Sequence, residues 1–267
     1  MTATEEWARA LRDWAIPDEI LSAAPEPPWW FPVGVFVDYA REAESGDWTP
    51  THRHAAVALP AGGVLLDVGS GAGAASLPLA PPAGRIVAVD ENHEMLQAAA
   101  ELLAGRVPIE IVEGRWPEAA DRVGIADVTV CANVLYNVAD AVGRFIEALD
   151  RSARRRVVVE LTAVHPMAEL SRFWRHFWNL DRPTRPNAED AIELIREVTG
   201  RDVSSERWCR HRSYLADGDS RHQTVPHIRR RLCLTPSADE EIARLLAEMP
   251  DADSAAVVTI CWDTGSL

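Results

Sequence analysis

The sequence predicts an α/β fold with a mostly parallel β-sheet covered by helices on both faces. Five short apolar runs between residues 63 and 162 alternate with segments of helical periodicity, which is the pattern of strands joined by crossover helices. The runs are almost continuous in Val, Ile and Leu, as expected for parallel strands that are buried on both faces. A glycine-rich segment follows the first run and indicates a ligand-binding turn.

The first 60 residues indicate helices separated by proline. Helices are predicted at residues 4–15, 33–44 and 50–59. Thr4 and Thr49 are expected to cap the first and the third of these helices, because a threonine hydroxyl can accept from free N–H groups of the first turn. The proline-rich segment 25–32 is expected to be irregular, because proline disfavours helix at its own position and before it.

The central region supplies the sheet. Strands are predicted at residues 63–69, 86–90, 108–114, 126–133 and 156–162. Helices are predicted at residues 73–80, 92–104, 117–122 and 138–150. Beyond these, we expect helices at 166–180, 187–199, 219–234 and 237–248 and strands at 203–214 and 255–262.

The segment from Asp67 to Gly73 is the most informative motif. Its glycines allow a ligand to approach the backbone closely. The spacing at 69–74 also fits a relaxed dinucleotide fingerprint, but a carboxylate at Asp67 favours an amine-bearing ligand over a pyrophosphate. Asp90 ends the second strand, where a carboxylate can bind ribose hydroxyls, and Asn133 ends the fourth at the same sheet edge.

Together these segments resemble class I S-adenosylmethionine-dependent methyltransferases over roughly residues 50–165. The resemblance implies a Rossmann-like sheet of seven strands whose last strand, 255–262, is antiparallel. It further implies that S-adenosylmethionine is the cofactor and that the protein is a methyltransferase.

The resemblance also assigns the cofactor-binding residues. Asp67 would face the methionine amine, and Asp90 would hold the ribose hydroxyls. Arg53, or its neighbour His52, would meet the methionine carboxylate. The remaining contacts would be Gly69, Ser70, Gly71 and Gly73 under the methionine, Glu91, Arg115 and Trp116 near the adenine, and Cys131, Ala132 and Asn133 beneath the sulfonium.

Catalytic residues are not specified by these motifs. His165 and Tyr136 are candidates, because each follows a strand at the edge where ligands bind, but ordinary packing is the favoured role for both. The aromatic residues of helix 166–180 repeat at helical spacing and indicate either core packing or a substrate lid. Scattered Cys and His residues fit no zinc pattern, so no metal site is expected.

Composition limits the class of protein. With 47% hydrophobic and 25% charged residues, the chain is not a disordered polymer. The four cysteines lack CxxC spacing and no secretory signal is evident at the first residues, so we expect a cytoplasmic protein with reduced thiols. All 27 basic residues are Arg, which excludes a lysine-based mechanism.

The expected organisation is an N-terminal helical cap at residues 1–48 and a methyltransferase domain at 49–267, with helical inserts at about 164–200 and 217–249. The net charge of -14 disfavours nucleic acid. The cap and the aromatic insert are both placed to cover the ligand edge, which favours a small-molecule methyl acceptor, and no apolar run is long enough for a membrane-spanning helix. Arg is nevertheless concentrated in residues 151–235, so an RNA or protein methyltransferase stays open, as does a non-catalytic S-adenosylmethionine-binding protein.

Overall fold

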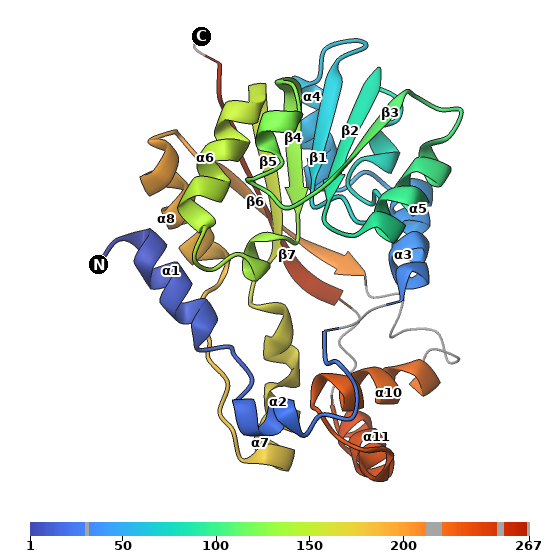
Figure 1. Ribbon diagram of the computed structural model, residues 1–267, viewed down its shortest axis with the longest axis vertical. Coiled ribbons are helices and arrows are strands. Elements are labelled where there is room, and N and C mark those ends of the chain that lie inside the picture. The colour runs from blue at the N-terminus through green and yellow to red at the C-terminus, as the bar shows by residue number, and fades with distance from the viewer. Residues whose placement is uncertain (30–31, 212–220, 250–253, 266–267) are drawn as a thin grey trace.

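A computed structural model describes residues 1–29, 32–211, 221–249 and 254–265. Its centre is one seven-stranded sheet with the order β3-β2-β1-β4-β5-β7-β6 (Figure 1). The strands are β1 (Val64–Val68), β2 (Arg85–Asp90), β3 (Ile109–Glu113), β4 (Ala126–Ala132), β5 (Ala153–Thr162), β6 (Ser204–His211) and β7 (Ser254–Asp263).

The strand directions confirm the predicted Rossmann-like sheet. β1 to β5 pair in parallel, and β7 lies antiparallel between β5 and β6. The chain reverses its order of strand addition between β1 and β4, so the carboxyl ends of these two strands border the position where open α/β sheets bind ligands. The predicted strand 203–214 ends beyond the described part of the chain.

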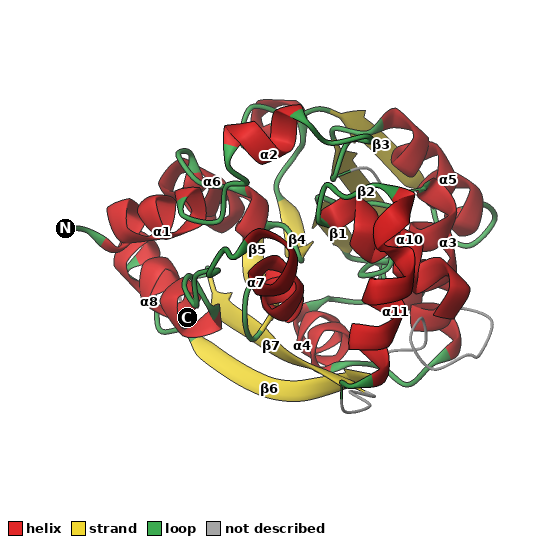
Figure 2. Cartoon of the chain, turned by 90° about the horizontal axis from the view of Figure 1, so that it is seen from below, coloured by secondary structure: helices red, strands yellow, loops and turns green. Residues whose placement is uncertain are grey.

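Helices cover both faces of the sheet. The α-helices are α1 (Ala3–Arg12), α2 (Asp18–Ser22), α3 (Val33–Ser45), α4 (Pro50–Ala58), α5 (His93–Leu103), α6 (Val142–Ser152), α7 (Ser171–Trp178), α8 (Ala188–Thr199), α10 (Arg221–Arg231) and α11 (Asp239–Ala247). Figure 2 shows α1, α6 and α8 together on one side of the sheet. Helices α3, α4 and α5 pack on the other side, around Leu65, Ile86 and Val128.

A smaller helical layer lies beyond the carboxyl edge of the sheet. In Figure 1, α7, α10 and α11 lie below the end of β5. They share a separate apolar cluster with Ile16 and the α2 residue Ile20. Phe173 and Trp174 of the aromatic helix are fully buried in this cluster, which makes core packing the role of those two side chains.

The N-terminal 48 residues are distributed over three layers. Helix α1 packs on α8, α2 joins the small helical layer, and α3 packs against α5. The boundary of a separate cap at residue 48 therefore stays a prediction.

Several local predictions are wrong. Residues 73–80 form turns and a short 3-10 helix, η1 (Leu77–Leu79), because Gly73 has a positive φ of 90° and Pro78 restricts the preceding residue. Residues 117–122 likewise form only the 3-10 helix η2 (Ala120–Arg122). The first helix is capped by Thr2, because Glu5 three residues later completes a capping box with it.

The aromatic helix and the next helix also differ in their boundaries. Predicted helix 166–180 consists of the 3-10 helix η4 (Pro166–Leu170) followed by α7, which ends at the left-handed residue Asn179. Helix α8 begins after Asn187 and ends at Gly200, as predicted. The described chain contains no helix that is long and apolar enough to cross a bilayer.

Candidate functional site

The glycine loop follows β1 directly and has an unusual backbone. Gly69, Gly71 and Gly73 have φ values of 68°, 52° and 90°, which side chains with a Cβ rarely adopt. The amides of Gly69 and Ser70 donate to the carbonyl of Val89, at 2.8 and 3.0 Å. A Cβ on Gly69 would also lie 2.3 Å from Val134, so the loop and the segment after β4 are in direct contact. Glycine is therefore required at this position for both conformation and space.

Asp67 is the outstanding polar group at this loop. Its side chain is buried, and neither carboxylate oxygen has a hydrogen-bond partner. Burial raises the pKa of Asp67 to about 7, an effect that the nearby Ser76 hydroxyl partly offsets and that the charge of Asp90 reinforces. A buried acceptor without a donor is costly, so this position suits a ligand that brings a donor, such as an amine.

Asp90 binds the opposite side of the loop. Its Oδ2 accepts from the amide of Gly71 at 2.9 Å, and its Oδ1 accepts from the amide of Asn92 at 2.9 Å. The end of β2 is thus tied to the loop at the end of β1. The structure brings Asp67, Asp90 and the glycines together at the carboxyl ends of β1 and β2. Their contacts with a cofactor stay a prediction.

The residues expected near the adenine separate into two environments. Arg115 Nε donates to Glu91 Oε2 at 2.7 Å, and both side chains are exposed. Trp116 instead lies in the core, where its Nε1 donates to the carbonyl of Phe145 at 3.2 Å. An exposed pair beside Asp90 can contact a ligand, whereas Trp116 is engaged in packing.

The end of β4 forms the neighbouring wall of the site. Cys131 is buried, and burial together with the charge of Asp67 raises the pKa of its thiol. Ala132 ends the strand, and Asn133 follows it in the left-handed region with a φ of 60°. The amide of Asn133 donates to the carbonyl of Glu160 at 2.7 Å, which links the ends of β4 and β5.

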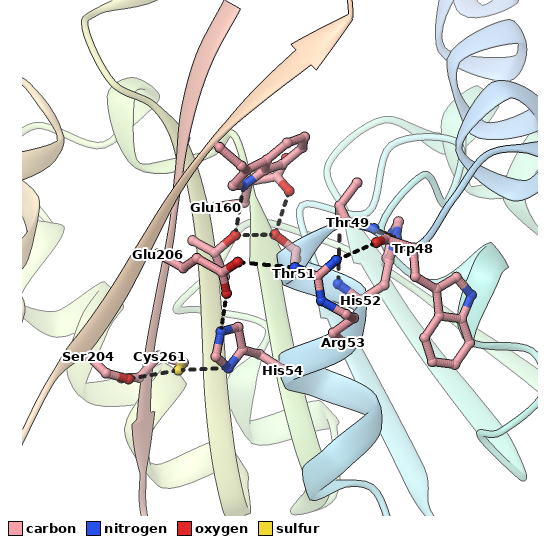
Figure 3. A network of polar contacts seen from close by, with 12 residues as sticks. Trp48, Thr49, Thr51, His52, Arg53, His54, Glu160, Ser204, Glu206 and Cys261 are labelled. Atoms are coloured by element: carbon pink, nitrogen blue, oxygen red, sulfur yellow. Dashed lines mark hydrogen bonds and ion pairs between the residues drawn. The ribbon is translucent and has the colours of Figure 1, made fainter.

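Helix α4 brings His52 rather than Arg53 to the glycine loop. Arg53 lies on the outer face, where it donates to Trp48 and forms an ion pair of 3.0 Å with Glu206 (Figure 3). His52 is buried, with Nε2 3.4 Å from the carbonyl of Ala74, and burial lowers its pKa. The expected contact of Arg53 with a methionine carboxylate therefore stays a prediction.

His165 and Tyr136 are both held by the N-terminal segment. The imidazole of His165 stacks on Trp14 with centroids 4.0 Å apart, and Tyr136 stacks on Trp7 at 5.7 Å. The Tyr136 hydroxyl donates to the carbonyl of Thr162 at 2.9 Å. Burial and the charge of Arg182 lower the pKa of His165 to about 4, so its ring is neutral near pH 7.

The protonation pattern of His165 also bears on the candidate role of general base. Its Nδ1 accepts from the amide of Met167 at 3.2 Å, so the proton of the neutral ring is on Nε2. Nε2 is then a hydrogen-bond donor. A catalytic role for His165 or Tyr136 stays a prediction.

A buried acidic residue at this edge is not among those predicted from the sequence. Glu160 lies in β5 with 5% of its surface exposed. Its carboxylate accepts from the hydroxyl of Thr51 at 2.5 Å (Figure 3) and pairs with Arg210. The available signal is a single acid within the apolar run of residues 157–161.

The central region of the chain is similar in sequence to a known protein family. A sequence model described as a methyltransferase domain matches residues 66–161, which run from β1 to β5. Residues 66–161 are therefore similar to a methyltransferase domain. This confirms the resemblance to class I S-adenosylmethionine-dependent methyltransferases over the part that contains the glycine loop.

Solved structures share the fold of this methyltransferase domain. A candidate methyltransferase from Bacillus halodurans superposes with a TM-score of 0.53 at 13% identity, covering 81% of this chain and 97% of its own. A methyltransferase from Thiobacillus denitrificans, solved with S-adenosyl-L-homocysteine, gives 0.50 at 20% identity, covering 87% and 98%. A candidate methyltransferase of an antibiotic biosynthesis pathway from Anabaena variabilis gives 0.53 at 15% identity, covering 83% and 99%. No curated protein matches the chain in sequence.

The arginines of residues 151–235 are mostly paired within the described part of the chain. Ion pairs join Arg156–Asp263, Arg172–Glu248, Arg175–Asp181, Arg185–Asp190, Arg201–Asp150, Arg207–Glu189, Arg210–Glu160, Arg229–Asp239 and Arg230–Glu26. Arg154 and Arg155 lie at the amino end of β5, opposite to the glycine loop. Much of the positive charge in residues 151–235 is therefore balanced locally.

No cluster of three metal-ligating side chains occurs among the residues that the structure describes. Cys209, His227 and Cys233 lie in that part of the chain. The side chains of His211 and His222 lie outside it.

Proposed function

We propose that the protein is an S-adenosylmethionine-dependent methyltransferase that acts on a small molecule. The observation that carries the proposal is Asp67, a buried carboxylate without a partner beside the glycine loop of a methyltransferase domain. S-adenosylmethionine supplies a methyl group on a sulfonium, together with an ammonium group that can donate to a carboxylate. The unpaired carboxylate of Asp67 therefore fits the ammonium group of this cofactor.

Each part of the site has a distinct task in the proposal. Asp67 binds the ammonium group, and the glycine loop from Gly69 to Gly73 lies along the methionine. Asp90 holds the ribose hydroxyls, and the pair of Glu91 and Arg115 borders the adenine. The segment Cys131–Asn133 lies beneath the sulfonium. Because the methyl group is already activated, these residues act mainly by orientation.

A small-molecule acceptor is favoured over RNA or protein by the charge distribution. Arginines of residues 151–235 form ion pairs within the chain, as in Arg207–Glu189 and Arg210–Glu160. A surface neutralised in this way attracts a polyanion weakly. The helical layer beyond the carboxyl edge of the sheet instead covers the side on which an acceptor would enter.

Calorimetry with S-adenosylhomocysteine tests the cofactor site. We expect Asp67→Asn to lower the affinity about tenfold or more, because an amide replaces a charge that pairs with the ammonium group. Asp90→Ala should weaken binding similarly, since it removes both the ribose contact and the bonds that hold the loop. Arg154→Ala is the matched control, because Arg154 is exposed at the opposite edge. Failure of the wild type to bind at millimolar ligand would refute the proposal.

The pH dependence gives a second readout. The pKa of Asp67 is raised to about 7, and only its ionised form attracts the ammonium group. Affinity for S-adenosylhomocysteine should therefore increase from pH 5 to pH 8 in the wild type. In Asp67→Asn this increase should be absent.

A further inference from the structure

Asn133 occupies a strained position next to the glycine loop. It is a non-glycine residue with a φ of 60°, directly after β4. Its successor, Val134, fills the space that a Cβ on Gly69 would need. A conformation of this kind costs free energy and persists only where the surroundings enforce it.

Glu160 is the residue that enforces it. The main chain of Glu160 accepts from the amide of Asn133 at 2.7 Å, and its Oε1 accepts from Asn133 Nδ2 at 3.2 Å. Oε2 accepts from the hydroxyl of Thr51 at 2.5 Å, and Arg210 pairs with Oε1. Both the backbone and the side chain of Asn133 are thus held by one buried residue.

The other partners of this carboxylate are themselves fixed. The guanidinium of Arg210 lies 5.2 Å from the ring centre of Tyr39 in α3 and 5.2 Å from that of Trp208 in β6. Thr51 is buried in α4 and also contacts Thr259 at 2.8 Å. Glu160 therefore has little freedom to turn away from Asn133.

This contact determines the orientation of the Asn133 side-chain amide, that is, where its nitrogen and its oxygen lie. A carboxylate can only accept, so the nitrogen faces Glu160 and the oxygen, Oδ1, occupies the other position. None of the described residues donates to Oδ1. The site consequently holds one oriented acceptor oxygen at the carboxyl end of β4, beside the loop expected to carry the methyl donor.

We propose that Glu160 is a positioning residue that orients Asn133 so that its Oδ1 binds an N–H or O–H group of the methyl acceptor. The proposal rests on the proposed function and narrows it to acceptors methylated at nitrogen or oxygen. The acceptor's lone pair forms the bond to the methyl carbon. The carbon–sulfur bond breaks with its electrons left on sulfur as a thioether, and the acceptor's proton passes to water. An amide oxygen is too weak a base to remove that proton, so Asn133 orients the acceptor.

The activity test measures transfer of tritiated methyl from S-adenosylmethionine to a panel of small amines, phenols and thiols. Asn133→Ala and Glu160→Met should each lower kcat about tenfold on amine or phenol acceptors, the size of one lost hydrogen bond. Glu160→Gln should retain most of the activity, because its amide oxygen can still accept from Asn133. Glu160→Met in the Asn133→Ala background should cost less than twofold, since Glu160 acts through Asn133.

Two measurements separate positioning from loss of fold. The Kd of S-adenosylhomocysteine should stay within about twofold in Glu160→Met and Glu160→Gln, which a collapsed site would not allow. Ser152→Ala removes a buried hydroxyl contact with Thr129 of the same strand β4 and should leave kcat unchanged. The proposal would be overturned if the effects of Glu160→Met and Asn133→Ala on kcat were additive. It would also be overturned if the acceptors were thiols and neither variant impaired methyl transfer to them.

Nuclear magnetic resonance tests the positioning role without requiring a known acceptor. The Asn133 side-chain amide signal, assigned by its absence in Asn133→Ala, should exchange slowly with water in the wild type and in Glu160→Gln. It should exchange quickly in Glu160→Met. Fast exchange in the wild type overturns the positioning role even if S-adenosylhomocysteine binds, whereas absent binding with slow exchange refutes the proposed function alone.

Discussion

At the scale of single residues, Asp67 shows how a binding site is formed at the expense of stability. The carboxylate is buried without a donor, and its pKa is raised from 3.8 to about 7. A carboxyl group whose pKa is higher in the folded protein binds its proton more tightly there, and this tighter binding stabilises the fold fully below the unfolded pKa. The stabilisation is lost as the pH rises towards 7, where Asp67 becomes charged in its buried position.

Asp67→Asn should therefore increase the free energy of unfolding near pH 7, although it weakens ligand binding. Relative to the variant, the wild type should lose up to about 4 kcal/mol of unfolding free energy between pH 4 and pH 7, with no further change at higher pH. Urea denaturation without ligand at several pH values measures this difference. The exposed Asp140→Asn should show no such trend. Parallel curves for wild type and Asp67→Asn would mean that Asp67 is not a destabilising charge.

At the scale of elements, caps and prolines decide where helices form. Asn187 Oδ1 accepts from the amides of Glu189 and Asp190 at 2.9 and 3.2 Å, and Asp190 accepts from the amide of Asn187 at 2.8 Å. This reciprocal cap begins α8, which packs against α1. By contrast, Pro78 prevents a full helix after the glycine loop, although hydrophobic periodicity predicts one.

Asn187→Ala should destabilise the protein by about 1 kcal/mol, because two amides of the first turn lose their acceptor. Asn187→Asp should restore most of this loss, since aspartate caps equally well. Thermal unfolding of the three proteins gives the comparison. If Asn187→Ala melted at the wild-type temperature, α8 would be held by packing alone.

At the scale of the whole molecule, the N-terminal segment ties the sheet to the helical layer. Trp14 stacks on His165 at the end of β5, and its Nε1 donates to the carbonyl of Arg185 at 2.7 Å. Arg182 lies over the same indole at 5.3 Å. One buried side chain thus connects the first 16 residues with the segment between β5 and α8.

Trp14→Ala should lower the unfolding free energy by about 3–5 kcal/mol through loss of buried contacts. It should also release residues 1–16, so that limited proteolysis cuts there before the sheet unfolds. Mass spectrometry of the early fragments locates the cut. Trp48→Ala is the control, because the Trp48 side chain is exposed. First cleavage elsewhere would contradict the docking role of Trp14.

The local sequence determined where the strands and the glycine loop lie in the chain, because each depends on residues that are close together in the sequence. Apolar runs specify buried parallel strands, and the pattern of Asp67 and the following glycines specifies one turn at the end of β1. The strand predictions and the cofactor-loop site hypothesis followed from this information. Helix 73–80 did not, since proline and positive φ overrode the periodicity.

Only the tertiary structure decided which distant side chains meet. Glu160 contacts Thr51, Asn133 and Arg210, which come from α4, the end of β4 and β6. No spacing in the chain encodes such a contact, because it arises from the order in which strands assemble into the sheet. The same reason explains why the sequence could not decide between Arg53 and His52. Both lie on α4, but only packing determines which one faces the glycine loop.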